Sequence, residues 1–344
     1  MQRKVLLVFL PLIVFISGCG APQNGTSESE LATDLGLTGN SRVARNFESY
    51  KSNRSQGCTN SGSTRKRVLL SGFGPFNRKH NISGAVVDLL QRSSLWPAVS
   101  AWPQNGQFDV PEFKPDDSPG ASGGIAIQRT LTFDGQEMEL CLLKLTVEWD
   151  FAAAVILHEA ESFQPDFILM TGYGANPTGV RLEAGALNKT SRLSGFDPRG
   201  KALGEVNAPV SDWIVPRELN LPDEIAMNWQ PQKIASRHRL RLDQFSESLG
   251  RREQGLAWRF VPMESADPLN NYVCNNVSYA VLAGLRLGAL PLAGGRLTLA
   301  PKFRKMPGAA FLHYPFNSDV TASDEVWMWA HLVAGIIADT HALP

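Results

Sequence analysis

The chain has 344 residues, of which 43% are hydrophobic and 19% charged, and its formal net charge is zero. This length and composition are typical of a globular protein with one large core or two modest ones. Zero net charge argues against a nucleic-acid partner held by a basic face. The four cysteines form no CxxC pair, so their spacing predicts no metal site, and we expect no cofactor.

The first residues have the features of an export signal. Gln2-Arg3-Lys4 is basic, residues 5–16 are apolar except for Pro11 and too few to span a bilayer, and Ile16-Ser17-Gly18-Cys19 follows. Small residues before this cysteine resemble the bacterial lipobox, which implies cleavage before Cys19 and lipidation of its thiol. The alternatives are an ordinary signal peptide and an uncleaved anchor. We expect an exported protein held in the cell envelope by a lipid, on the periplasmic side of the outer membrane if the host is Gram-negative.

Residues 20–64 are dominated by Ser, Asn, Gly and Thr, with few large apolar side chains. Such a segment buries too little apolar area to offset its chain entropy, so it is predicted to be a flexible tether between the membrane and a folded domain. Cys58 lies near its end. In an oxidising compartment it could pair with Cys141, the other cysteine without an assigned role, and the sequence does not decide whether it does.

Apolar runs alternate with helical patterns through residues 65–344. The predicted strands cover residues 67–71, 125–133, 137–147, 166–172 and 307–316, and the predicted helices lie near residues 86–90, 150–163 and 321–340. Asp134-Gly135 predicts a hairpin turn. The helix-then-strand order predicts a three-layer α/β/α sandwich with a mostly parallel central sheet in a single domain. Residues 92–124 and 195–257 interrupt the pattern and are predicted to be insertions, the second being a lid or mere decoration.

One stretch places a cysteine at the start of a predicted helix. The loop that begins at Asp267 runs into a pattern with Val277, Val281 and Leu285 on one face, which puts Cys274 in or just before the first helical turn. Unpaired backbone N–H groups and the helix dipole favour an anion there, and hence the nucleophilic thiolate. The alternative is a buried structural cysteine.

Two further residues stand out by their surroundings. Of the six histidines, His313 is the one that ends a short apolar strand before a Pro-containing loop, and Glu183 is a single acid among largely apolar and small residues. Taken alone, each is more often structural, as a hydrogen-bonded histidine and a solvated strand carboxylate. The loops 72–76 and 172–179 each follow a predicted strand, which favours a site at the carboxyl ends of the strands.

Four segments resemble, in order, the motifs of the pyroglutamyl peptidase I family of cysteine peptidases. They are Val68–Phe76, Gly172–Asn188, Tyr272–Asn275 and Phe311–Phe316. The resemblance implies that Cys274 is the nucleophile, His313 its base and Glu183 the carboxylate that orients the imidazole. It also implies a peptide or small amide substrate with an N-terminal 5-oxoproline, cleaved through an acyl-enzyme. The alternative is a non-catalytic binding or structural lipoprotein of the envelope on the same scaffold.

The resemblance further assigns a set of residues to substrate binding: Phe73, Phe76, Tyr173, Tyr272, Val273 and, by its position after the glutamate segment, Arg192. Tyr173 stands where the family has a glutamine that hydrogen-bonds the lactam ring of the substrate. Either its ring swings outward and its hydroxyl reaches the lactam from a new direction, or the pocket is shortened. We therefore expect thiol chemistry to be kept and pyroglutamyl specificity to be altered. The export signal and the insertions leave the oligomeric state undecided.

Overall fold

The computed structural model describes residues 39–54, 57–75, 80–92, 112–116, 124–133, 135–174, 176–190, 213–270, 272–319 and 321–339. The predicted export signal with Cys19 lies outside these ranges, as do Phe76, Asp134 and Arg192. What the sequence suggests for those residues therefore remains a prediction.

A seven-stranded sheet forms the centre of the molecule, in the order β2-β3-β1-β4-β11-β5-β8. Its strands are β1 (Lys66–Phe73), β2 (Gly124–Phe133), β3 (Gln136–Leu145), β4 (Phe167–Tyr173), β5 (Gly179–Leu182), β8 (Arg259–Pro262) and β11 (Gly308–Tyr314). The four neighbours β3, β1, β4 and β11 are parallel to one another. Strand β2 runs antiparallel to β3, and β5 runs antiparallel to β11. Strand β8 is parallel to β5. The predicted mostly parallel sheet and the β2–β3 hairpin are confirmed.

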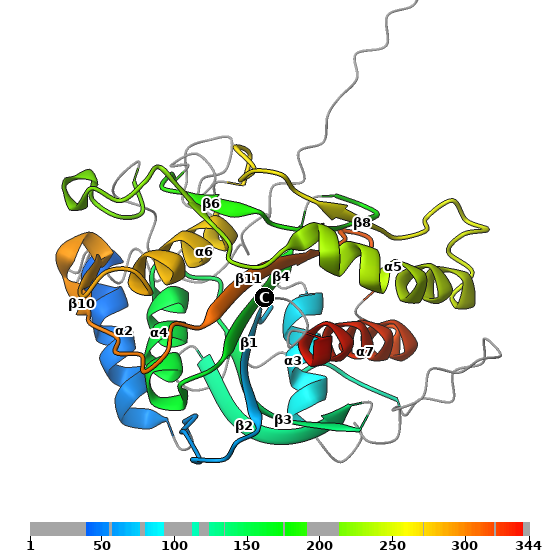
Figure 1. Ribbon diagram of the computed structural model, residues 1–344, viewed down its shortest axis with the longest axis horizontal. Coiled ribbons are helices and arrows are strands. Elements are labelled where there is room, and N and C mark those ends of the chain that lie inside the picture. The colour runs from blue at the N-terminus through cyan, green and yellow to red at the C-terminus, as the bar shows by residue number, and fades with distance from the viewer. Residues whose placement is uncertain are drawn as a thin grey trace, which may run out of the picture.

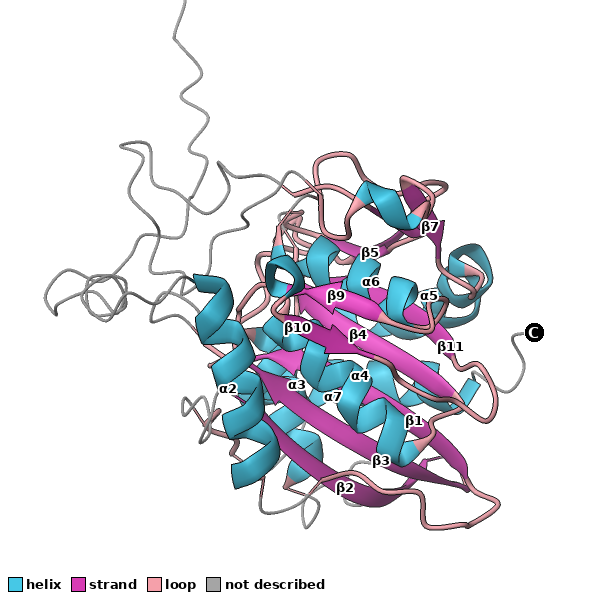
Figure 2. Ribbon diagram, turned by 90° about the vertical axis from the view of Figure 1, so that its left-hand side faces the viewer, coloured by secondary structure: helices cyan, strands magenta, loops and turns pink. Residues whose placement is uncertain are grey.

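Helices cover both faces of this sheet (Figures 1 and 2). They are α2 (Gly39–Asn53), α3 (Ile82–Gln91), α4 (Phe151–Phe163), α5 (Pro231–Ser248), α6 (Val273–Gly284) and α7 (Ser323–Asp339). Helix α7 packs on α3 and α5 on one side, whereas α4 packs on α6 and α2 on the other. The predicted three-layer α/β/α arrangement is confirmed.

Short elements complete the chain beyond these layers. They are the strands β6 (Gly185–Leu187), β7 (Glu224–Ala226), β9 (Leu290–Leu292) and β10 (Leu297–Leu299) and the 3-10 helices η3 (Arg217–Leu219) and η4 (Ala293–Gly295). Strand β6 pairs with β7, and β9 pairs with β10. Strand β6 follows β5 closely and lies against α6, so it forms part of the surroundings of the α6 N-terminus.

The central strands form because their residues are apolar on both sides. In β1 and β4, residues 68–70 and 168–170 are fully buried, as expected for parallel strands covered by helices on each face. Gly72 lets α3 approach β1 closely, because a Cβ atom there would lie 2.2 Å from the carbonyl oxygen of Ser83. The carboxyl end of β1 is therefore tightly packed against the start of α3.

The predicted tether is folded over much of its length, which corrects the prediction. Residues 39–53 form helix α2, in which Val43, Phe47 and Tyr50 are buried and pack against the core. These three residues follow the i, i+4, i+7 spacing of a helix face, which the polar composition of the segment obscures. Cys58 forms a disulfide with Cys141 of β3, so the end of the segment is also joined covalently to the sheet.

A buried glutamate further holds this segment to the domain. Glu159 of α4 accepts hydrogen bonds from the Tyr50 hydroxyl at 3.0 Å and from the backbone N–H of Cys58 at 2.7 Å, and it forms an ion pair with Arg54. Three partners from one segment compensate for burying the carboxylate. The folded domain therefore includes α2 and the residues around Cys58, which precede the predicted start at residue 65.

The described part of the second insertion belongs to the helix layers. Helix α5 buries Ile234, Leu242 and Phe245, and it packs against α7 and β8. It is therefore neither a lid nor a loose decoration. Within the described ranges, no helix combines the length and the apolar composition that crossing a bilayer requires.

Candidate active site

The carboxyl ends of β4 and β11 bring two predicted motifs side by side. The Cα atom of His313 is paired with that of Gly172 in the parallel register of these strands. A Cβ atom added to Gly172 would lie 2.9 Å from Sγ of Cys274 and 2.9 Å from the ring of Phe311. The thiol at the start of α6 therefore lies directly against the end of β4, where glycine leaves room for it.

Glu183 reaches the same place from the other side of β11. It comes directly after β5, which pairs with β11, and its backbone N–H donates to the carbonyl oxygen of Phe311 at 3.1 Å. Its Oε1 atom lies 2.7 Å from Nδ1 of His313. His313 is 4% exposed and Glu183 is fully buried, so water competes little for this contact.

The imidazole of His313 is hydrogen-bonded to Glu183, and the Cys274 thiol lies near enough for its charge to act on the ring. Burial alone would lower the pKa of His313, but the thiolate of Cys274 and the carboxylate of Glu183 outweigh burial and raise it to about 10. With Nδ1 directed to Glu183, the other ring nitrogen is the one available to the thiol. The three side chains thus form the arrangement of nucleophile, base and orienting carboxylate that covalent catalysis by a cysteine needs.

The N-terminus of α6 is fixed around the thiol. The backbone N–H of Asn276 donates to the carbonyl oxygen of Tyr272, which begins the helix. The side chain of Asn275 accepts from the N–H of Leu187 and donates to the carbonyls of Leu187 and Lys189, each at 2.9 Å. The N–H groups of the first turn lie before the first intrahelical hydrogen bond, so they can face an oxyanion.

The predicted substrate-binding residues that the structure describes differ in how far they are buried. Phe73 ends β1 and is buried, Val273 is buried in the first turn of α6, and Tyr272 is partly buried. Tyr173 ends β4 with 39% of its surface exposed, and its hydroxyl donates to the carbonyl oxygen of Phe316. The Tyr173 ring contacts that of Phe316 at a tilt of 43°, with 5.6 Å between centroids. The Tyr173 ring is thus partly exposed, and its hydroxyl is bonded to Phe316.

An ion pair beside the site was not predicted from the sequence. Arg181 is opposite His313 in the β5–β11 register, and its guanidinium binds the carboxylate of Asp267 in the loop before α6. Burial would raise the pKa of Asp267, but hydrogen bonds from the Leu269 N–H and from Arg181, with the nearby positive charge of His313, hold it below its usual value. Arg181 and Asp267 are 86 residues apart in sequence, and no local sequence pattern connects them.

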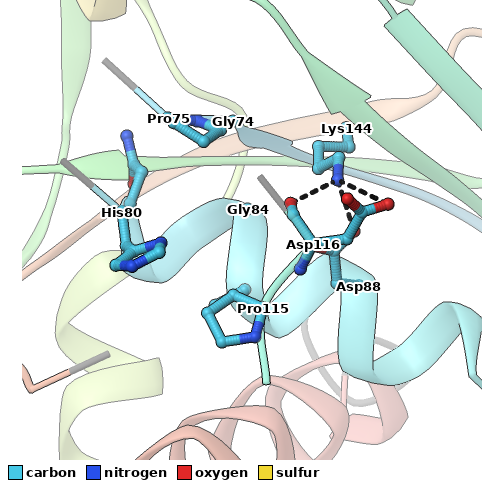
Figure 3. A pocket seen from close by; sticks show the side chains of 10 residues that line it. Gly74, Pro75, His80, Gly84, Asp88, Pro115, Asp116 and Lys144 are labelled. Atoms are coloured by element: carbon cyan, nitrogen blue, oxygen red, sulfur yellow. Dashed lines mark hydrogen bonds and ion pairs between the residues drawn. The ribbon is translucent and has the colours of Figure 1, made fainter. Parts of the chain in front are cut away.

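A small pocket lies beside the loop after β1, and its lining does not include Cys274, His313 or Glu183 (Figure 3). Gly74 and Pro75 line one side, and Nζ of the buried Lys144 lies 2.8 Å from Oδ1 of Asp88 and 2.9 Å from the carbonyl oxygen of Asp116. Its volume of about 10 Å³ holds about one water molecule. The pocket therefore surrounds a buried ion pair.

The described residues include one grouping with donor atoms close enough to hold a metal ion, formed by Cys58, Cys141 and Glu159. The two sulfur atoms are joined in a disulfide, and the carboxylate accepts hydrogen bonds from Tyr50 and the Cys58 N–H. Thiolate ligands are thus not available there, and this grouping is a structural cluster.

No protein-family model matches the chain, and no curated protein sequence matches it. Solved structures do. Pyroglutamyl peptidase I of Bacillus amyloliquefaciens is similar at 16% identity with a TM-score of 0.45, over 80% of this chain and 98% of the other. The pyrrolidone carboxyl peptidase of Fervidobacterium islandicum AW-1 is similar at 18% identity with a TM-score of 0.45, over 81% and 100%. That of Thermus thermophilus is similar at 22% identity with a TM-score of 0.38, over 78% and 98%.

Proposed function

We propose that the protein is a cysteine peptidase that removes an N-terminal pyroglutamyl group, or a similar small cyclic amide, from peptides. The observation that carries the proposal is the buried His313, which is hydrogen-bonded to Glu183 and paired in register with Gly172, the residue against which the Cys274 thiol lies. The four sequence segments that resemble pyroglutamyl peptidase I motifs support the choice of substrate. The altered recognition residue Tyr173 widens that choice to other cyclic or small N-terminal amides.

The geometry supports the following reaction. His313 takes the proton of the Cys274 thiol, and the thiolate attacks the carbonyl carbon of the scissile amide. Backbone N–H groups of the first turn of α6 stabilise the oxyanion that forms. His313 then protonates the departing amine, which leaves an acyl-enzyme on Cys274. A water molecule, activated by His313, hydrolyses the acyl-enzyme and restores the thiol, while Glu183 keeps the imidazole in one tautomer.

A purely structural role for these residues is less favoured. A binding protein on this scaffold has no need to bury a histidine with a raised pKa between a thiol and a carboxylate, because buried ionisable groups are costly to desolvate. Strongly shifted ionisable groups gather at functional sites more often than elsewhere. The same site lies at the carboxyl ends of parallel strands, where α/β proteins bind ligands.

Substrate turnover and thiol labelling test the proposal together. We expect the folded protein to release coumarin from a pyroglutamyl-aminomethylcoumarin substrate and to be alkylated by iodoacetamide at Cys274, the free cysteine of the described residues. Cys274→Ala abolishes both, and Cys274→Ser, which keeps the side-chain volume, is the matched control for folding. Full hydrolysis by Cys274→Ala would refute the peptidase assignment.

We also propose that the mature protein is exported and attached to the envelope membrane by a lipid on Cys19. The lipobox-like sequence and the Cys58–Cys141 disulfide support this, since disulfides persist in oxidising compartments. Metabolic labelling with a fatty acid should mark the wild-type protein in the membrane fraction, and Cys19→Ala should remove the label and release the protein. Wild-type protein found in the cytoplasm with Met1 intact contradicts the proposal.

A further inference from the structure

We propose that Asp150 is a positioning residue for the nucleophile, because it fixes the first turn of α6 so that the Cys274 thiol stays within reach of His313. This inference rests on the proposed function, in which Cys274 is the nucleophile. Asp150 lies in the loop between β3 and α4, outside every segment that resembles a peptidase motif. Its role follows from its contacts in the structure.

Asp150 and Asn276 form a reciprocal pair. The backbone N–H of Asp150 donates to Oδ1 of Asn276, and Nδ2 of Asn276 donates to Oδ1 of Asp150, both at 2.8 Å. The second carboxylate oxygen of Asp150 accepts from the backbone N–H of Ala293 in η4, also at 2.8 Å. The carboxylate thereby joins the nucleophile helix to a separate part of the chain.

The residue before Asp150 contacts the helix on the other side of the thiol. The ring of Trp149 packs edge-on against that of Tyr272, with 5.6 Å between centroids. Tyr272 is the N-cap of α6, two residues before Cys274, and Asn276 is two residues after it. Two adjacent residues therefore hold both flanks of Cys274. A sliding or rotation of the first turn breaks at least one of these contacts.

The backbone of Asp150 indicates that this arrangement is imposed by its surroundings. Its φ of 59° and ψ of −36° lie in a region that residues with a side chain rarely adopt. Such strained residues persist where neighbouring contacts over-determine them, and they gather at functional sites. Here the strain turns the backbone N–H and the side chain of the same residue toward one partner, Asn276.

The contact between Asp150 and Asn276 can be tested by exchanging hydrogen-bond donors and acceptors while the side-chain volumes stay nearly the same. In Asp150→Asn the new amide cannot accept from both Asn276 and Ala293, so two donors face each other at one contact. The double substitution Asp150→Asn with Asn276→Asp restores all three bonds: the amide of residue 150 donates to the new carboxylate, and its oxygen accepts from Ala293. Conformational strain and volume are nearly unchanged in both proteins.

The measurement is the rate of Cys274 alkylation by iodoacetamide as a function of pH, from about pH 6 to about pH 10. A thiolate held by imidazolium reacts at neutral pH, whereas an ordinary cysteine reacts near its reference pKa of about 8.5. We expect Asp150→Asn to lower the neutral-pH rate about tenfold to a hundredfold, with little change above about pH 9.5. The double variant should recover to within about threefold of the wild type.

Tyr50→Phe is the control, because it removes a buried hydrogen bond to Glu159 far from Cys274 in the chain and should lower stability without changing the pH profile.

A folded Asp150→Asn with the wild-type pH profile overturns the inference, as does a folded double variant that fails to recover. If Asp150→Asn does not fold, a wild-type profile in the double variant supports the pairing and a lost one refutes it. A wild-type thiol that reacts like an ordinary cysteine overturns this inference and the proposed function together, whereas missing pyroglutamyl hydrolysis with an activated thiol affects only the substrate assignment.

Discussion

Glu183 directs one carboxylate oxygen to Nδ1 of His313 at 2.7 Å across 130 residues of sequence. Its other oxygen, Oε2, is buried and has no hydrogen-bond partner among the described residues. The side chain of Glu183 is thus held chiefly by its hydrogen bond to His313. A carboxylate in this position selects the tautomer with the proton on Nδ1 and stabilises the imidazolium once the thiol proton is transferred.

Glu183→Gln tests this relationship. The amide keeps the volume of the side chain but removes the negative charge, so the imidazolium loses a stabilising partner during the reaction. We expect kcat on a cleaved substrate to fall roughly 10²- to 10⁴-fold, with a much smaller change in KM. Glu218→Gln, on the exposed turn η3, is the control and should behave as the wild type. An unchanged kcat in Glu183→Gln would exclude the orienting role.

The raised pKa of His313 predicts how its contribution to stability depends on pH. Its pKa in an unfolded chain is about 6.5, and Cys274 and Glu183 raise it to about 10 in the folded protein. Folding therefore favours the protonated ring. The stabilisation is fully present below about pH 6.5, decreases as pH rises and is lost as pH passes the folded value of about 10.

Urea unfolding of the wild type and of His313→Gln at about pH 6, 8 and 10 measures this difference. The wild type should exceed the variant most at the lowest of these pH values and least at the highest. His238→Gln is the control, since burial and the nearby Arg241 lower the pKa of His238 to about 4, so that its difference from the wild type should be constant above about pH 7. A His313→Gln difference that grows with pH would contradict the sign.

The sheet and most helices could be predicted because their signals are local. Continuous apolar runs marked β1 and β4, and a turn dipeptide marked the β2–β3 hairpin. Helix α2 escaped prediction because Val43, Phe47 and Tyr50 are few apolar residues in a polar segment. The segment is stabilised by partners distant in sequence, namely Glu159 and Cys141, and composition does not record such contacts.

In the candidate site, too, residues with a local sequence signal could be predicted, and contacts between distant residues could not. The sequence placed Cys274 at a helix start and His313 at a strand end, but their contact with Glu183 was implied only by the resemblance to a family. Asp150 was predicted only as the start of a helix, because the sequence does not show its positive φ or its contact with Asn276. The orientation of Tyr173 also depends on Phe316, 143 residues away, whose carbonyl receives its hydroxyl.

Removing the Cys58–Cys141 disulfide should destabilise the domain. The bridge spans 83 residues of sequence and joins the end of the α2 segment to β3, so it restricts the unfolded chain strongly. We expect the double substitution Cys58→Ala with Cys141→Ala to lower the free energy of unfolding by about 2–4 kcal/mol. Reductant should lower the stability of the wild type and leave that of the variant unchanged. Equal responses of the two proteins to reductant would show that the bridge does not form.

The substitution Tyr173→Gln tests whether Tyr173 alters the specificity for pyroglutamyl substrates. The Tyr173 hydroxyl is bonded to the carbonyl of Phe316 and its ring contacts the Phe316 ring, so this side chain is already engaged by Phe316. A glutamine lacks this ring contact and can turn toward Cys274, where its amide can both donate to and accept from a lactam. One or two regained hydrogen bonds are worth roughly 1–3 kcal/mol, so pyroglutamyl turnover should rise by about one to two decades.

Tyr173→Phe is the matched control for this substitution. It removes only the hydroxyl and keeps the ring, so its turnover of pyroglutamyl substrates should stay near that of the wild type while the glutamine variant rises. Iodoacetamide labelling of Cys274 in each variant verifies that the site is intact. If Tyr173→Gln folds, reacts at Cys274 and shows no gain, then residue 173 does not line the substrate pocket. The alignment of Gly172–Asn188 with the family motif would then give the position of Glu183 without giving that of the lactam contact.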